Sequence, residues 1–185
     1  MDIRQFRAEL DQAFEKAGFE RRAIPRCKDP IWILPGREGE RSFFQHALRR
    51  PWGFLLSGVL SIDVPAFREW LSNEFPRNQH GILEGTLLSW HIANDPNLFF
   101  GIETEEPPYE YWATQIRRRL VVLPDTIEGL LRAESERAKG LKVFSDAPKT
   151  WTYFRAWAEG DPPLHPPPHR LPDGRIVDAA ANDPV

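Results

Sequence analysis

The chain has 185 residues and a net charge of -3 at pH 7, which gives no general attraction for the phosphate backbone of nucleic acids. It contains one cysteine, so an internal disulfide is excluded, and no apolar run reaches the roughly 20 residues that a membrane-spanning helix needs. A hydrophobic fraction of 41% supplies one core, so we expect a single domain over residues 1–159, followed by a proline-rich tail over residues 160–185. The single cysteine and the lack of a long apolar run favour a cytoplasmic location.

The N-terminal third predicts one helix followed by extended segments. Apolar side chains recur every three or four residues over 3–17, which is the spacing of an amphipathic helix, and Gly18 follows as a C-terminal cap. Proline and glycine turns then separate short apolar runs. The predicted extended segments are residues 19–24, 31–34, 41–48 and 54–62.

The remainder of the domain predicts further helices and two more strands. Pro65 fits the first turn of a helix that ends before Pro76. Residues 82–93 and 97–103 are extended in pattern, and the turn residues 94–96 between them predict a hairpin. Helical spacing returns over residues 109–123, 127–138 and 150–158.

These elements indicate the α+β class. Strands and helices do not alternate often enough for a doubly wound parallel sheet. We therefore expect an antiparallel sheet of about five to six strands, with an N-terminal helix and C-terminal helices packed on one face and a proline-rich tail.

An acidic segment is the first candidate for a functional surface. Glu103 and Glu105 alternate at the end of a predicted strand, Glu106 follows, and Glu110 lies one turn into the next helix. Carboxylates in such a position are typical of a solvated contact surface, which attracts basic partners and speeds association. With Trp112, these residues form the predicted partner-binding surface.

A catalytic cleft is the alternative. Trp90, His91, Glu103 and Trp112 would line it in a small hydrolase-like enzyme, provided that the pocket perturbs a carboxylate or a histidine. The sequence carries no nucleophile elbow, phosphate-binding loop or dinucleotide fingerprint. We accordingly assign no catalytic residue and no cofactor, and we lean towards a protein without enzymatic activity.

The remaining reactive side chains predict no metal site. His165 and His169 are four residues apart, but the three prolines between them favour a polyproline II segment that holds the two rings about 12 Å apart. Cys27 follows a proline-containing stretch, and we expect a partly buried thiol in a loop.

The tail has three possible readings. Residues 161–168 contain stacked prolines that cannot continue a helix. They form either a polyproline ligand for a partner, a strap across the domain, or a semi-rigid extension. Pro172, Asp173 and Gly174 make a good turn for a small hairpin between residues 170–171 and 175–177.

The first 65 residues or so resemble a bacterial family of small domains of unknown function. The matching features are the helix that ends in Gly18 and Phe19, the basic pair Arg21 and Arg22, the strand 31–34, the Phe44-Gln45 strand and the apolar strand 54–62. The resemblance implies a twisted antiparallel sheet with flanking helices. Similar cytoplasmic domains occur as immunity or accessory proteins beside toxin and defence genes.

The sequence therefore favours a non-enzymatic bacterial protein that binds another protein, as an immunity protein that neutralises a toxin or as a defence accessory. The partner would be encoded nearby. We expect no membrane partner, and nothing in the sequence favours a nucleic-acid partner.

Overall fold

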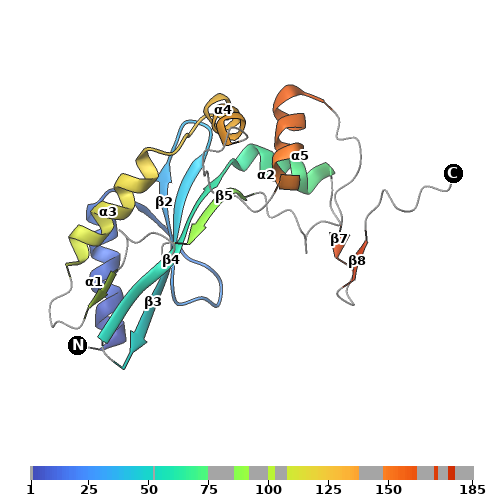
Figure 1. Ribbon diagram of the computed structural model, residues 1–185. Helices are drawn as coiled ribbons and strands as arrows, with labels where there is room; N and C mark the ends of the chain where they lie inside the picture. Colours follow the sequence, from blue (N-terminus) through green and yellow to red (C-terminus); the bar gives the residue numbers. More distant parts are fainter. Residues whose placement is uncertain are drawn as a thin grey trace.

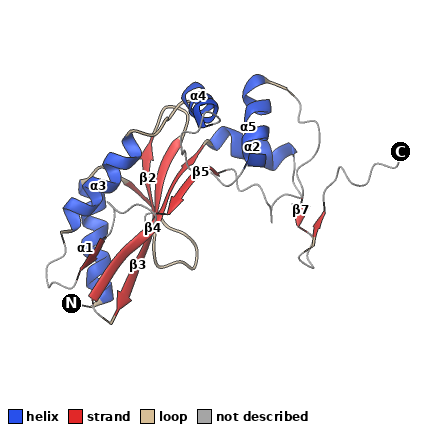
Figure 2. Ribbon diagram, viewed as in Figure 1, coloured by secondary structure: helices blue, strands red, loops and turns tan. Residues whose placement is uncertain are grey.

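The fold is that of a computed structural model of the chain. The structure describes residues 2–51, 53–74, 86–91, 100–102, 108–137, 148–161, 169–170 and 175–177. The structure consists of an antiparallel sheet and helices. Helices α1 and α3 lie on one face of the sheet, and α2, α4 and α5 lie towards its other end (Figures 1 and 2). The predicted α+β class is confirmed.

Helix α1 (Ile3–Lys16) begins and ends as the sequence predicts. The Asp2 side chain accepts hydrogen bonds from the backbone N–H groups of Arg4 and Gln5 at 2.7 and 2.8 Å, which caps the first turn. Gly18 closes the helix with a φ of +84°, a conformation that glycine adopts without steric cost. The buried side of α1 consists of Phe6, Leu10, Ala13 and Phe14.

The sheet is antiparallel throughout. Strands β1 to β5 are neighbours in chain order, and β6 also pairs with β4. The central hairpin runs from Glu40 opposite Asp63 to Arg50 opposite Gly53. The strands are β1 (Glu20–Arg22), β2 (Ile31–Pro35), β3 (Glu40–Arg50), β4 (Gly53–Asp63), β5 (Thr86–His91) and β6 (Phe100–Ile102).

Alternation along β3 and β4 fixes which face of the sheet is covered. Phe43 and Ala47 of β3 lie opposite Leu60 and Leu56 of β4, and all four are buried in the same cluster as the inner side of α1. Gln45 lies between them on β3, and its Oε1 accepts a hydrogen bond from the indole N–H of Trp32 at 2.8 Å. That bond satisfies the buried indole on this face.

The predicted hairpin between the fifth and sixth strands is wrong. β5 and β6 do not pair with each other; both are antiparallel to β4, on which Val59 faces His91 and Leu56 faces Phe100. The two strands therefore run in the same direction along one edge of β4. Turn chemistry at residues 94–96 indicates where the chain leaves a strand, but not which strand it returns to.

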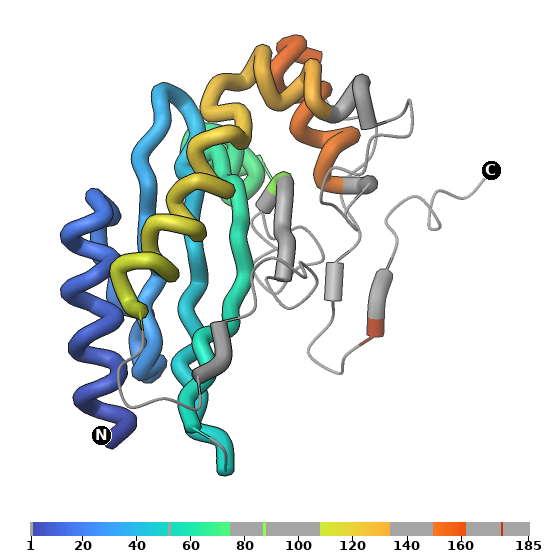
Figure 3. The backbone as a smooth tube through the Cα atoms, turned by 60° about the vertical axis from the view of Figure 1, so that its left-hand side comes forward, coloured from blue at the N-terminus to red at the C-terminus, as the bar shows by residue number. Residues whose placement is uncertain are grey.

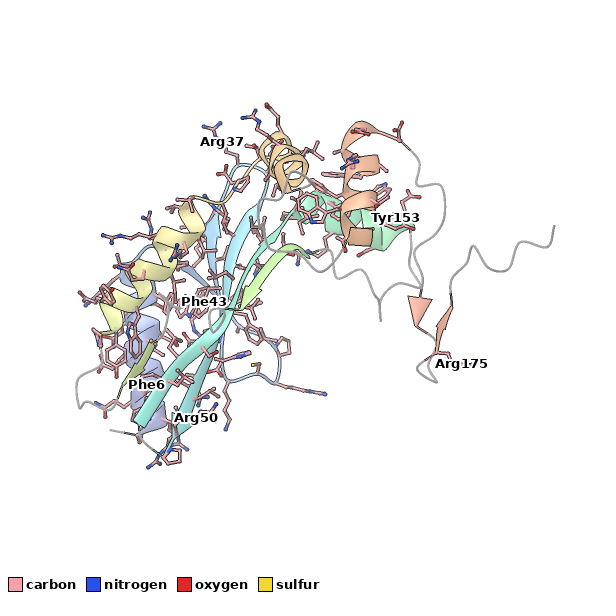
Figure 4. All side chains as sticks on the ribbon, in the orientation of Figure 1. Phe6, Arg37, Phe43, Arg50, Tyr153 and Arg175 are labelled. Carbon is pink, nitrogen blue, oxygen red and sulfur yellow. The ribbon has the colours of Figure 1, made fainter. Side chains whose placement is uncertain are left out.

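Two hydrophobic clusters form the core. The first lies between the sheet, α1 and α3 (Tyr109–Val121), and Figures 3 and 4 show both helices beside the strands and Phe6 and Phe43 between the layers. The second is formed around Ile62 of β4 by α2 (Pro65–Glu74), α4 (Ile127–Arg137) and α5 (Pro148–Glu159). Leu123 packs against both clusters and joins them.

The loop between β2 and β3 is fastened to the junction of α3 and α4. The backbone N–H groups of Glu38 and Gly39 donate to the carbonyl oxygen of Asp125, each at 3.0 Å. The Glu38 carboxylate accepts from the backbone N–H of Ile127 at 2.8 Å and thereby satisfies a donor of the first turn of α4. Arg41 donates to the carbonyl oxygens of Val121 and Pro35 from the same side.

The tail contains the small hairpin that its turn residues predict. β7 (His169–Arg170) and β8 (Ile176–Val177) pair with each other, His169 opposite Val177. The prolines at 162–168 and His165 lie outside the described residues. Among the helices that the structure describes, none combines the length and apolar character required to cross a bilayer.

Candidate functional site

Glu110 is the described member of the predicted acidic surface; Glu103, Glu105 and Glu106 lie outside the described residues. Glu110 is exposed in the first turn of α3, and its Oε1 accepts a hydrogen bond from Lys16 Nζ of α1 at 2.9 Å. That hydrogen bond raises the pKa of Lys16. Because both side chains are solvated, the pair is weak and can exchange for a partner's charges at low cost.

Trp112 does not belong to an exposed surface. Its side chain is 3% exposed, and its ring meets those of Phe6 and Tyr109 edge-on, with centroids 6.2 and 6.0 Å apart. The indole is a core group of the first cluster, so the prediction that it contacts a partner is wrong. Its place in the apolar spacing of residues 109–123 already indicated this burial.

The predicted hydrolase cleft is not formed with Trp112 in its wall. Trp90 and His91 lie on β5 opposite Leu60 and Val59, while Trp112 is enclosed between α1 and the sheet. Glu103 lies outside the described residues. The described side chains do form a pocket at another place in the fold.

Such a hollow lies where α1 meets the N-terminal end of α3. It has a volume of about 340 Å³ and is lined by Glu9, Gln12, Ala13, Lys16, Pro108, Tyr109, Glu110 and Tyr111. Pro108 at the N-cap gives α3 no side-chain cap. Backbone N–H groups of the first helical turn have no partner within a helix, so this end of α3 offers donors beside the hollow.

Tyr109 is, besides Lys16, a titratable group of the hollow whose pKa is perturbed. Burial first, and the negative charge of Glu9 second, raise the pKa of Tyr109 to about 12. The phenol therefore stays protonated at neutral pH and acts as a hydrogen-bonding group. A phenol in this state is not poised as a base or nucleophile, and the hollow is better suited to binding than to proton transfer.

Tyr111 is a functional candidate that the sequence analysis missed. It is 59% exposed and lines the same hollow, one residue before the buried Trp112. Successive residues of a helix point about 100° apart, so a helix that buries Trp112 turns Tyr111 towards solvent. The inner stripe of α3 was readable in the sequence, and the outward direction of Tyr111 follows from it.

Neither Cys27 nor the histidine of β3, His46, belongs to a cluster of potential metal ligands among the described residues. Cys27 is exposed, so the predicted partly buried thiol is wrong. His46 is half-buried on β3, with its ring edge-on to that of Phe44 at a centroid distance of 4.5 Å. In the described ranges, no three His, Cys, Asp or Glu side chains gather as ligands for a metal ion.

Comparison with known proteins adds no relative: no protein family, curated protein or solved structure matches the chain.

Proposed function

We propose that this protein is a non-enzymatic interaction module of the bacterial cytoplasm, acting as an immunity protein or a defence accessory. Its partner would bind where α1 meets the N-terminal end of α3. The observation that carries the proposal is Tyr111, a large aromatic side chain that is 59% exposed at the rim of a hollow. Tyrosine is one of the residue types that contribute most to the binding energy of interfaces.

The charged groups around Tyr111 support a protein partner. Lys16 and Glu110 lie on the same rim and form an exposed ion pair, and polar groups surrounding an aromatic anchor are the usual arrangement of an interface. The acidic residues at 103, 105 and 106 precede this rim in the chain. They would contact a basic region of the partner, in line with the resemblance of the first 65 residues.

Co-expression with the product of a neighbouring gene tests the proposal. We expect a complex that survives purification, and rescue of growth if that product is toxic. Tyr111→Ala and Glu110→Lys should each weaken the complex at least tenfold, because they remove the anchor and reverse a charge at its edge. Glu159→Lys, a charge reversal on the exposed end of α5, is the matched control and should leave affinity unchanged. Absence of both complex and rescue, or an unchanged affinity of Tyr111→Ala, would contradict the proposal.

A further inference from the structure

Exposed apolar side chains gather on the outer side of α3. In the part of the chain that the structure describes, the large hydrophobic residues left exposed are Tyr111, Val121 and Val122, at 59%, 41% and 76%. Tyr111 and Val121 belong to α3, and Val122 continues its helical backbone as the C-cap. Single exposed apolar residues are ordinary on a protein surface, but three on one helix form a feature of that helix.

Helical geometry places Tyr111 and Val122 on one line with an arginine. At about 100° per residue, Arg118 and Val122 fall within roughly 20° of the direction of Tyr111. Val121 lies about 80° and Arg117 about 120° to one side of this line, with Arg117 at the edge of the exposed side. With a rise of about 1.5 Å per residue, the stripe from Tyr111 to Val122 is roughly 16 Å long. We call these five residues the outer stripe of α3; its length matches three turns of a partner helix.

The outer stripe has an uncompensated positive charge. Within the described residues, Arg117 and Arg118 are exposed and make no ion pair, and neither does the exposed Arg37. The hydrogen bonds from Glu38 and Gly39 to Asp125 hold Arg37 beside the C-terminal end of α3, where Figure 4 shows it.

Three described carboxylates near the C-terminal end of α3 already have partners inside the molecule. Asp125 lies 3.6 Å from Arg41, Glu38 accepts from the backbone of Ile127, and Glu128 pairs with Arg132 at 2.6 Å. Among the described residues, none of these three carboxylates pairs with Arg117, Arg118 or Arg37. Charge of one sign around an apolar stripe selects a partner of the opposite sign.

We propose that the outer stripe of α3 is a docking surface for an acidic amphipathic helix of a partner protein. The apolar side of that helix would cover Tyr111 and Val122, and its carboxylates would pair with Arg117, Arg118 and Arg37. This inference rests on the proposed interaction function and names the chemistry of the partner segment. A second copy of this chain fits less well, because an α3 pair would bring the arginines of both copies together.

A display library of 16-residue helical peptides is the probe. Leu and Ala occupy one side of each peptide, and Glu, Gln and Lys vary on the flanks. We expect selection on the wild-type protein to enrich Glu over Lys. The selected peptide should bind the R117E/R118E variant at least tenfold more weakly, and its Glu→Lys counterpart should bind that variant better than it binds wild type. Val122→Asp should also lower the affinity for the selected peptide, although this variant keeps both arginines.

Matched controls keep the result specific to α3. R49E/R50E reverses two exposed arginines at the end of β3, where Figure 4 labels Arg50, and should leave peptide affinity unchanged. Circular dichroism verifies that each variant is folded. The inference is overturned if R117E/R118E leaves the peptide affinity unchanged. It is also overturned if the selection enriches Lys or yields no binding peptide. A wild-type dimer that Val122→Asp dissociates assigns the stripe to a second copy and overturns it as well. The partner complex that depends on Tyr111 and Glu110 is measured separately, so the interaction function can stand while this inference fails.

Discussion

Gly58 lies in the middle of β4, where neighbouring backbone and side-chain atoms leave no room for a Cβ atom. A Cβ there would fall 2.1 Å from the Phe44 carbonyl oxygen and 2.4 Å from a ring atom of Phe43. The backbone also has a φ of +153° at this position, a conformation that residues other than glycine rarely adopt. Gly18 is the useful contrast: its φ is +84°, but nothing lies within 4 Å of a Cβ added there.

This contrast predicts different costs for the same substitution. Gly58→Ala should lower the free energy of unfolding by about 3 kcal/mol or more, because backbone strain and displacement of the Phe43 ring both contribute. Gly18→Ala should cost only about 1 kcal/mol, from backbone strain alone. Urea denaturation measures both. Equal losses in the two variants would show that the close packing of Phe43 over Gly58 adds nothing.

At the scale of elements, α1 carries two aspartates whose pKa values move in opposite directions. The two backbone hydrogen bonds from Gln5 and Arg4 lower the pKa of Asp2 at the N-cap. Burial raises the pKa of Asp11, against the opposing effect of its ion pair with Arg21. The helix therefore favours the charged form of one carboxyl group and the neutral form of the other.

These shifts predict opposite dependences of stability on pH. The stabilisation from charged Asp2 is complete above its ordinary pKa of about 3.9 and is lost as the pH falls through the lower folded-state pKa. Asp2→Asn keeps a capping side chain but removes this titration. Wild type should therefore lose stability relative to Asp2→Asn on acidification below about pH 4.

Asp11→Asn is the internal comparison. The stabilisation from neutral Asp11 is complete below its unfolded-state pKa and is lost as the pH rises through the raised folded-state pKa. Wild type should accordingly gain stability relative to Asp11→Asn on acidification. Urea unfolding from neutral to acidic pH gives both differences, and a difference that stays constant with pH for either variant would contradict the corresponding shift.

The local sequence pattern predicts the elements whose position depends on their own residues. It does not predict contacts between segments that are far apart in the chain. The spacing over residues 3–17 and 109–123 locates α1 and α3, and the long apolar run locates β4. By contrast, the capping of α4 by Glu38 joins residues 89 positions apart. The shared edge of β5 and β6 likewise depends on β4, and no local turn signal encodes it. Tyr111 belongs to the first kind, because the inner stripe of α3 defines its outer one.

At the scale of the whole molecule, the described tail strands form a sheet of their own. β7 pairs with β8 and with no strand of the main sheet. Helix α5 is closed by the first two residues of the tail: Gly160 has a φ of +77°, and the Asp161 N–H donates to the carbonyl oxygen of Ala156 at 2.8 Å. Among the residues whose burial the structure describes, the members of the second hydrophobic cluster all precede the tail.

Truncation after Asp161 should therefore leave the Tm within about 2 °C of the full chain, since less than about 1 kcal/mol is at stake. Differential scanning calorimetry of the two proteins is the measurement. A loss of several degrees would show instead that the tail is a strap across the domain. If the truncated protein is equally stable but no longer binds its partner, the tail is itself a partner ligand.

The common edge of β5 and β6 has a consequence for how this chain can change in length. Between the pairs Val59–His91 and Leu56–Phe100, two residues of β4 correspond to eight residues of the other segment. Residues can be added or removed there without altering the register of either flanking strand, because both strands are fixed by β4 alone. Insertions of new sequence between His91 and Phe100 should therefore leave the pairing of both strands with β4 intact.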